Sequence, residues 1–156
     1  MSRSAKKGPF VAEKLFKKVT ALNDWLVGVT EYDHEAFDAS FGLSIPDGYE
    51  YAWNASGTLV EGRGVCASYA YAFNALVNAA GVPTVVVTGD VLAGGAHAWN
   101  KVQVDGAWRA VDPTWNDSPA GNQYLMIPDA GFTGQANRFE SLEWMIDWSI
   151  PEYAAG

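Results

Sequence analysis

Cysteine is nearly absent from this chain, which contains 1 such residue among 156. A single cysteine cannot form an intrachain disulfide, and it cannot supply a cysteine-rich zinc cluster. Long apolar runs are also missing, since no stretch approaches the roughly 18 residues that a membrane-spanning helix requires. The first residues lack the apolar core of a signal peptide. As written, the chain is expected in the cytoplasm, although a fragment of a secreted or cell-surface protein would show the same features.

Basic residues are scarce, and most of them lie at the start of the chain. Residues 1–20 hold 6 of the 10 Lys and Arg residues, so the remainder, with 4 basic and 17 acidic residues, has a net charge of −13. Such an acidic body disfavours contact with nucleic acid and with anionic membranes. We therefore expect neither nucleic acid nor membrane among the partners.

About half of the residues are apolar and 7 are tryptophan, which suffices for a substantial core in one domain.

We interpret residues 1–9, which are polar and basic, as a loose tail. Residues 30–60 show weak periodicity, so we expect loops with short helical turns there. Between these segments, apolar residues recur at spacings of three and four, which indicates an amphipathic helix over residues 10–29. Its apolar positions are Val11, Leu15, Val19, Leu22, Leu26 and Val29.

The second half of the chain combines one helix with several strands. A helix is predicted over residues 66–80, where Gly81 supplies a stop signal, and a β-branched strand over 82–88. Two extended runs, 96–104 and 107–114, flank Asp105-Gly106, the strongest short-range signal for a hairpin. Residues 121–128 indicate another strand, whereas the end of the chain has too little pattern to assign. This order predicts an α+β fold with a helix packed on an antiparallel β-sheet.

Cys66 directly follows Gly62-Arg63-Gly64-Val65 and opens the predicted helix. Free N–H groups and the positive end of the helix dipole favour a thiolate at such a position, and the same N–H groups can bind an oxyanion. A lone cysteine is more often a small buried hydrophobe than a nucleophile. The glycines allow a sharp turn and close approach of a ligand, which favours the catalytic alternative.

His97 and Asp112 lie on the two strands of the predicted hairpin. If Asp105 and Gly106 form a two-residue turn, Trp99 faces Asp112 and His97 faces Thr114. His97 and Asp112 are then diagonal neighbours on one face, within reach of each other. A carboxylate in that position can orient the ring and favour its charged form. A β-bulge would shift this register.

A thiol at a helix start and an oriented His–Asp pair together match the logic of cysteine nucleophiles. At these residues the chain resembles the transglutaminase-like superfamily, especially its small bacterial members. The matching segments are LVEGRGVCASYAYAF, AHAWNKVQVDGAWRAVDPTWND and, more weakly, LNDWLVGVTEYD. The resemblance implies a papain-like α+β core without cofactor or metal. It also implies Cys66 as nucleophile, His97 as acid and base, and Asp112 as the residue that orients the imidazole.

Two aromatic residues are further candidates by the same resemblance. Tyr32, in the VTEYD segment, is a candidate oxyanion donor, and Trp99 a candidate wall beside His97. Ordinary core positions are equally good interpretations of both residues. We assign Trp108 and Trp115 to the core, and His34, which has no partner visible in the sequence, to the surface.

The first twenty residues fit the rest of the chain poorly. MSRSAKKGPFVAEKLFKKV resembles the N-terminus of a bacterial small-subunit ribosomal protein, whose remainder is missing here. A fused reading frame or a borrowed leader would explain this, and chance similarity of a basic helix is the alternative. We therefore separate residues 1–20, a basic tail and the start of the first helix, from a transglutaminase-like domain over 21–156.

The resemblance implies a thiol enzyme acting on peptide or protein amides through an acyl-enzyme. Transamidation, deamidation and peptide hydrolysis share that intermediate, so all three remain open. The alternative is a non-catalytic module that keeps the fold for binding or scaffolding. Because such modules usually lose one of the three catalytic residues, the presence of Cys66, His97 and Asp112 favours the enzyme.

Overall fold

The computed structural model describes residues 2–41 and 44–141, with side chains from residue 12 onward in those ranges. Helices come first and a sheet follows. The helices are α1 (Ser2–Val29), α2 (His34–Ser40), α3 (Cys66–Ala79) and α4 (Pro113–Asn116), and the strands are β1 (Glu31–Tyr32), β2 (Arg63–Gly64), β3 (Thr84–Val91), β4 (Gly95–Val104), β5 (Ala107–Val111), β6 (Leu125–Ile127) and β7 (Arg138–Glu140). Short helical turns lie at Glu50–Trp53, Gly57–Glu61, Asp129–Gly131 and Gly134–Ala136.

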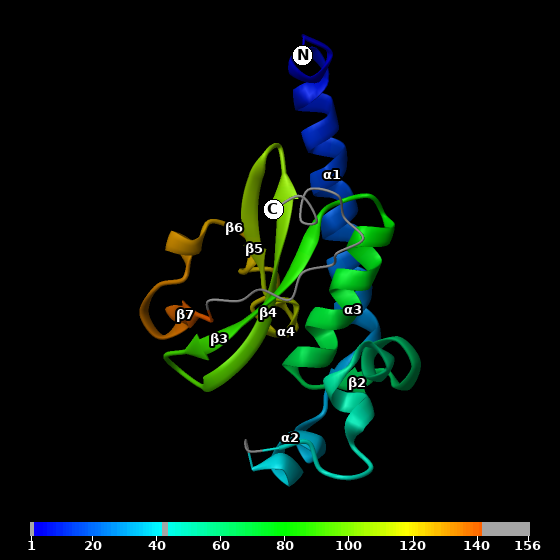
Figure 1. The fold of residues 1–156 in the computed structure, drawn as a ribbon, viewed down its shortest axis with the longest axis vertical. Coiled ribbons are helices and arrows are strands. Elements are labelled where there is room, and N and C mark those ends of the chain that lie inside the picture. The colour runs from blue at the N-terminus through cyan, green and yellow to red at the C-terminus, as the bar shows by residue number, and fades with distance from the viewer. Residues whose placement is uncertain (1, 42–43, 142–156) are drawn as a thin grey trace.

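Five strands form an antiparallel sheet in the order β6-β5-β4-β3-β7, and α1 and α3 lie side by side against it (Figure 1). The core between helices and sheet contains Val19, Leu26, Phe73 and Val102. The other face of the sheet carries a second core, which includes Trp99 and is closed by residues of the segment between β6 and β7. The prediction of an α+β fold with a helix packed on an antiparallel sheet is confirmed.

The helix that begins at Cys66 follows the sequence pattern closely. Residues 66–80 were predicted, and α3 occupies Cys66–Ala79. Tyr69, Phe73 and Val77 of the predicted apolar face are fully buried, and Leu76 packs against the same core. Burial of each such large side chain stabilises the fold by about 1.5–3 kcal/mol. Packing on the sheet therefore fixes the helix, and with it the position of Cys66.

The prediction for the start of the chain is wrong in one respect. Residues 1–9 were interpreted as a loose tail, but α1 begins at Ser2. Gly8 and Pro9 are poor helix formers, which favoured a tail, but the helix continues through them to Ser2. Within α1, Val19 and Leu26 are buried as predicted, whereas Val29, at the last turn, is 42% exposed. The helix crosses the boundary at residue 20 without a break.

The hairpin forms in the predicted register. Val104 pairs with Ala107, and Asp105 and Gly106 adopt the positive φ angles of 55° and 76° that a two-residue turn of this kind requires. The second strand is shorter than predicted, because β5 ends at Val111 and α4 begins at Pro113. The expected strand over residues 121–128 corresponds to β6, at Leu125–Ile127.

Two remaining sequence observations concern the membrane and the C-terminal tryptophans. In the described part of the chain, no helix combines the length and the hydropathy needed to cross a bilayer.

Trp144, Trp148 and Tyr153, in the part of the sequence that was left unassigned, lie outside the described residues.

Candidate active site

Cys66 is the first residue of α3, where the helix dipole is positive. The chain arrives from β2, which forms a parallel pair with β1 in which Tyr32 lies opposite Gly64. Gly64 is required at this approach, because a Cβ atom there would lie 2.3 Å from Cβ of Ser68. The N-cap residue, Val65, makes no side-chain hydrogen bond to the helix. The predicted position of Cys66 at a helix start is thus confirmed.

His97 lies on β4, where it pairs with Gly89 of β3. Its Nε2 atom is 2.7 Å from Oδ2 of Asp112, and its side chain lines two cavities together with Cys66. Because Nε2 is engaged with Asp112, Nδ1 is the ring nitrogen that remains to face the sulfur. The structure therefore brings Cys66, His97 and Asp112, which are far apart in the sequence, together in one cluster.

Asp112 is the N-cap of α4, and its side chain is fully buried. Oδ1 accepts a hydrogen bond from the backbone N–H of Trp115, and Oδ2 accepts from His97 and from Nη1 of Arg138 at 2.8 Å. The expected pairings of Trp99 with Asp112 and of His97 with Thr114 are absent, since the ladder ends at Asn100 and Val111. The backbone N–H of Asp112 instead donates to Tyr124 on the β6 side. The two side chains meet nevertheless, from a strand and from a helix cap.

The electrostatics of this cluster favour a charged imidazole. Burial by itself would lower the pKa of His97, but the Asp112 carboxylate and the Cys66 side chain outweigh it and raise the pKa to about 10. Burial would raise the pKa of Asp112, yet the adjacent His97 and Arg138 cations hold it below its ordinary value. Asp112 is therefore an anion and His97 a cation at neutral pH.

Two cavities meet at Cys66 and His97. The larger, of about 520 Å³, extends from α2 to the ends of β3 and β4, where Asp90 lines it. The smaller, of about 190 Å³, is lined by Tyr32, by Trp115 and by the loop that leads into β4. Cys66 and His97 line both cavities, so a substrate can reach the sulfur and the imidazole from two sides.

The sequence profile of the Transglutaminase-like superfamily matches residues 10–113. This segment is more than half of the chain, and it contains Cys66, His97 and Asp112. The chain belongs to the transglutaminase-like superfamily. The match starts at residue 10, so it includes the second half of the segment that resembles a ribosomal protein.

Two solved structures share the fold of this transglutaminase-like chain. One is a crystal structure of a TGase, with a TM-score of 0.61 and 18% identity over 99% of this chain and 47% of the other. The other is described as a "Putative Cysteine Protease" from Cytophaga hutchinsonii, with a TM-score of 0.54 and 22% identity over 94% of this chain and 44% of the other. The chain thus spans about half the length of each of these proteins. No match was found among curated proteins.

Tyr32, the candidate oxyanion donor by resemblance, lies on the wall of the smaller cavity, which Cys66 also lines. The β1–β2 pair places it opposite Gly64, and it lines the smaller cavity together with Cys66 and His97. Burial, followed by the nearby Cys66 and Asp33, raises the pKa of the Tyr32 phenol. The hydroxyl therefore keeps its proton and can donate a hydrogen bond at neutral pH.

The tryptophans divide between core and site. Trp99 is fully buried in the second core and stacks on His97, with ring centroids 5.9 Å apart, but it lines neither of the two cavities. Trp108 packs against the second core, as expected. Trp115 also packs there, but its ring lies 5.6 Å from His97 and lines the smaller cavity, a contact the sequence did not predict. His34 is exposed, as predicted, and its ring lies 4.9 Å from Tyr32.

Arg138 is the site residue that the sequence analysis missed. It forms an ion pair with Asp112, and its side chain is 3% exposed. A single arginine in a segment without clear periodicity gives no signal that could have identified it. Within the described residues, no group of three or more His, Cys, Asp or Glu side chains is arranged to hold a metal ion.

Proposed function

We propose that this chain is a thiol-dependent acyl-transfer enzyme that acts on peptide or protein amides. The observation that carries the proposal is the cluster of Cys66, His97 and a fully buried Asp112, in which His97 is hydrogen-bonded to Asp112 at the point where two cavities meet. A thiol beside an imidazole that is itself held by a third group is the arrangement of an activated cysteine nucleophile. The resemblance to a TGase and to a protein described as a cysteine protease agrees with this chemistry.

In the first half-reaction, the Cys66 thiolate attacks the carbonyl carbon of the amide and forms a tetrahedral intermediate. The C–N bond then breaks, and the His97 imidazolium gives its proton to the departing amine or ammonia. A thioester on Cys66 remains. Asp112 keeps its charge throughout, and it stabilises the imidazolium and fixes the ring orientation.

The negative oxygen of the tetrahedral intermediate needs hydrogen-bond donors. The backbone N–H groups at the start of α3 are suited to this, because they carry the positive end of the helix dipole. The Tyr32 hydroxyl, which lines the same cavity as Cys66, is a second donor in this proposal. Removal of one such donor typically lowers kcat by about 10²–10³-fold.

In the second half-reaction, water or an amine attacks the thioester. His97 accepts a proton from that nucleophile, the new C–O or C–N bond forms, and the Cys66 sulfur leaves as a thiolate. We expect water to be the usual acceptor, because the cavity on the Tyr32 side, of about 190 Å³, leaves little room beside Cys66 for a second peptide.

Incubation with a casein-like glutamine donor and a labelled primary amine tests this proposal. Released ammonia and cleaved peptide bonds are measured with and without the amine. We expect ammonia or new N-termini without added amine, and little label in the protein. Efficient incorporation with little release in the absence of amine would contradict hydrolysis as the main outcome. Release of nothing under either condition would favour a non-catalytic module.

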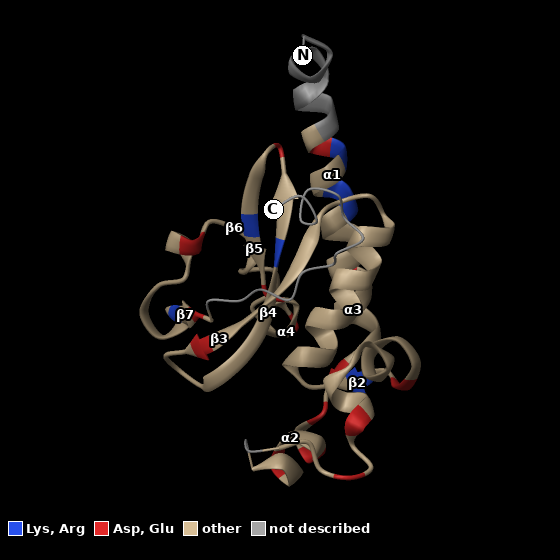
Figure 2. Ribbon diagram, in the orientation of Figure 1, with Lys and Arg blue, Asp and Glu red and all other residues tan. Residues whose placement is uncertain are grey.

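The charge around the larger cavity predicts which peptides react best. Asp90 is exposed and lines this cavity, and Figure 2 shows further acidic residues on α2, near β2 and at β3, with one basic residue near β2. Residues 30–62 contain 7 acidic residues and no Lys or Arg. We therefore expect peptides with a lysine near the reacting amide to have a higher kcat/KM than matched peptides with glutamate.

The substitution Asp90→Asn measures how much Asp90 itself contributes to the preference for lysine peptides. The exposed pair of Asp90 with a peptide lysine is worth up to about 1 kcal/mol, so kcat/KM for the lysine peptide should fall about fivefold. A norleucine peptide of the same length serves as the control and should react equally with both proteins. An equal loss on both peptides would assign Asp90 a structural role instead.

A further inference from the structure

Arg138 is a buried cation that reaches the candidate site from outside the segment matched by the superfamily profile. It is the first residue of β7, and its side chain is 3% exposed. The profile match ends at residue 113, so membership of the superfamily assigns Arg138 no role. A buried guanidinium is unfavourable unless a partner compensates its charge. The contacts of Arg138 therefore indicate what it does.

Arg138 contacts the same groups that surround His97. Its Nη1 donates to Oδ2 of Asp112 at 2.8 Å, and this oxygen also accepts the hydrogen bond from His97. Its guanidinium carbon lies 4.8 Å from the centroid of the Trp99 ring and 4.7 Å from that of Trp115. These are the two rings beside His97. A third ring, Phe132, lies 3.7 Å away, so stacking fixes the plane of the guanidinium.

The backbone holds Arg138 in place through β3. β7 pairs with β3, and a Cβ atom on Gly89 would lie 2.1 Å from the carbonyl oxygen of Phe139. Gly89 also pairs with His97 on the other side of β3. The close approach that Gly89 permits therefore sets the distance between the strand of Arg138 and the strand of His97.

The ionisable groups of this cluster come from five parts of the fold. Asp112 is the anion, and His97 and Arg138 are cations that share one of its oxygens. Arg138 is always protonated, whereas His97 changes charge during the proposed reaction. The ionisable groups that bear on the cluster are Tyr32 from β1, Cys66 from α3, His97 from β4, Asp112 before α4 and Arg138 from β7.

We propose that Arg138 is a positioning residue of this site, which holds the Asp112 carboxylate against His97 and limits how tightly Asp112 retains the imidazolium. The role rests on the proposed function, because it concerns the same thiol and imidazole. A permanent positive charge opposes proton binding at every neighbouring group. Without Arg138, the proton of the His97 imidazolium should therefore be bound more tightly.

A purely structural role is the alternative. In that case Arg138 only fastens the segment between β6 and β7 to the sheet, through Asp112 and through the Ala136 carbonyl oxygen, to which its Nε donates at 3.1 Å. Its replacement would then lower stability, but it would leave the pH dependence of the remaining folded protein unchanged. The two roles therefore predict different pH dependences for the alkylation of Cys66.

The rate of alkylation by iodoacetamide, measured against pH, distinguishes them. Cys66 is the single cysteine of the chain, so the rate reports this residue alone. In Arg138→Gln, the profile should move to higher pH by about two units, the effect of one charge about 5 Å away at an effective dielectric constant of about 20. The midpoint of the His97 imidazole resonances in NMR should move in the same direction.

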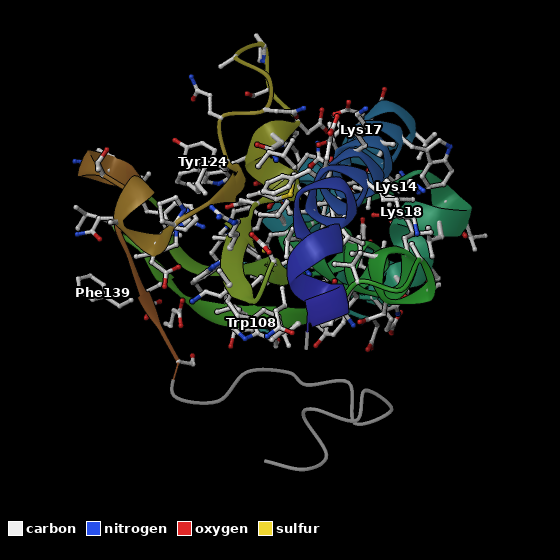
Figure 3. The ribbon with its side chains drawn as sticks, turned by 90° about the horizontal axis from the view of Figure 1, so that it is seen from above. Lys14, Lys17, Lys18, Trp108, Tyr124 and Phe139 are labelled. Carbon is white, nitrogen blue, oxygen red and sulfur yellow. The ribbon has the colours of Figure 1, made fainter. Side chains whose placement is uncertain are left out.

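Two variants serve as controls. Arg138→Lys keeps the charge but loses the planar fork, so its midpoints should stay at the wild-type values while the alkylation rate of folded protein falls about twofold or more. Lys17→Gln makes the same change in net charge at an exposed position of α1, which Figure 3 shows across the molecule from Phe139, the neighbour of Arg138. Its profile should match that of the wild type.

Unshifted midpoints in folded Arg138→Gln would overturn the positioning role. If Arg138→Gln does not fold, Arg138→Lys is tested instead. An alkylation rate per folded molecule equal to that of the wild type would also overturn the positioning role. Failure of the proposed function is a separate result, in which the wild type is alkylated but processes no amide. The shift can still be measured in that case, since alkylation needs no substrate.

Discussion

Cys66→Ala is expected to lower amide cleavage or transfer by about 10⁵-fold, to the background rate, because no acyl-enzyme can form without the sulfur. The chain contains no second cysteine that could replace it. The free energy of unfolding should change by less than about 0.5 kcal/mol, since the residue is small and only partly buried. The measurement is turnover of the casein-like donor, together with urea unfolding of both proteins.

Cys66→Ser is the matched control for this prediction. Serine keeps the shape of the side chain, but its hydroxyl ionises far less readily than a thiol, so His97 cannot hold it as a charged nucleophile. We expect activity near that of the alanine variant, with an unchanged fold by circular dichroism. Activity that survives in Cys66→Ala would show that the reaction does not pass through a thioester.

The sequence predicted those parts of the site that depend on local signals. Asp105-Gly106 fixed the hairpin register, since its residues readily adopt positive φ angles. The glycines before Cys66 and the apolar face of residues 66–80 located the start of α3. The hairpin register and the helix start depend on residues that are neighbours in the chain, so both can be predicted from a single sequence.

The meeting of His97 with Asp112 was predicted by an argument that is only partly correct. The hairpin does bring the two segments together, but Asp112 lies beyond the last paired residue, Val111. Pro113 has no N–H to donate, and Asp112 caps α4 instead of extending β5. As the N-cap of α4, Asp112 directs its carboxylate toward His97. The two side chains are therefore in contact although β5 ends at Val111.

The residues that the sequence missed all depend on contacts between distant segments. Arg138 reaches Asp112 only because β7 pairs with β3, and β7 has three residues and no regular pattern. Trp115 lies beside His97 because α4 turns it there, and in the sequence it resembles any core tryptophan. Contacts with distant segments, and not the local preference of these residues for helix or strand, determine where such short elements pack. A single sequence contains little information about those contacts.

Asp112→Asn is expected to lower kcat by about 10⁴-fold, as the corresponding change does in a Ser–His–Asp triad. The amide keeps the shape of the carboxylate but not its charge. One of the groups that now donate to Asp112, from His97, Arg138 or the backbone of Trp115, would face an N–H₂ group. His97 then loses the anion that favours its charged form.

The same variant should be less stable, because Arg138 remains buried without its anion. Breaking a buried pair on one side costs about 3 kcal/mol or more. Asp105→Asn is the control, since it makes the same chemical change in an exposed turn where Asn-Gly is equally suited. It should leave both activity and stability near the wild-type values.

The stability difference between wild type and Asp112→Asn should depend on pH in a defined direction. The folded protein raises the pKa of His97 from its ordinary value of 6.5 to about 10, chiefly because Asp112 overcomes the effect of burial. This contribution to stability is complete below about pH 6.5 and is lost as the pH rises through about 10. The lowered pKa of Asp112 acts in the opposite range, so its contribution is present above about pH 3.9 and declines on acidification. Urea unfolding at pH 7.0 and 9.5 should therefore give a larger difference at the lower pH, and an equal difference at both would show that His97 does not carry the charge assigned to it.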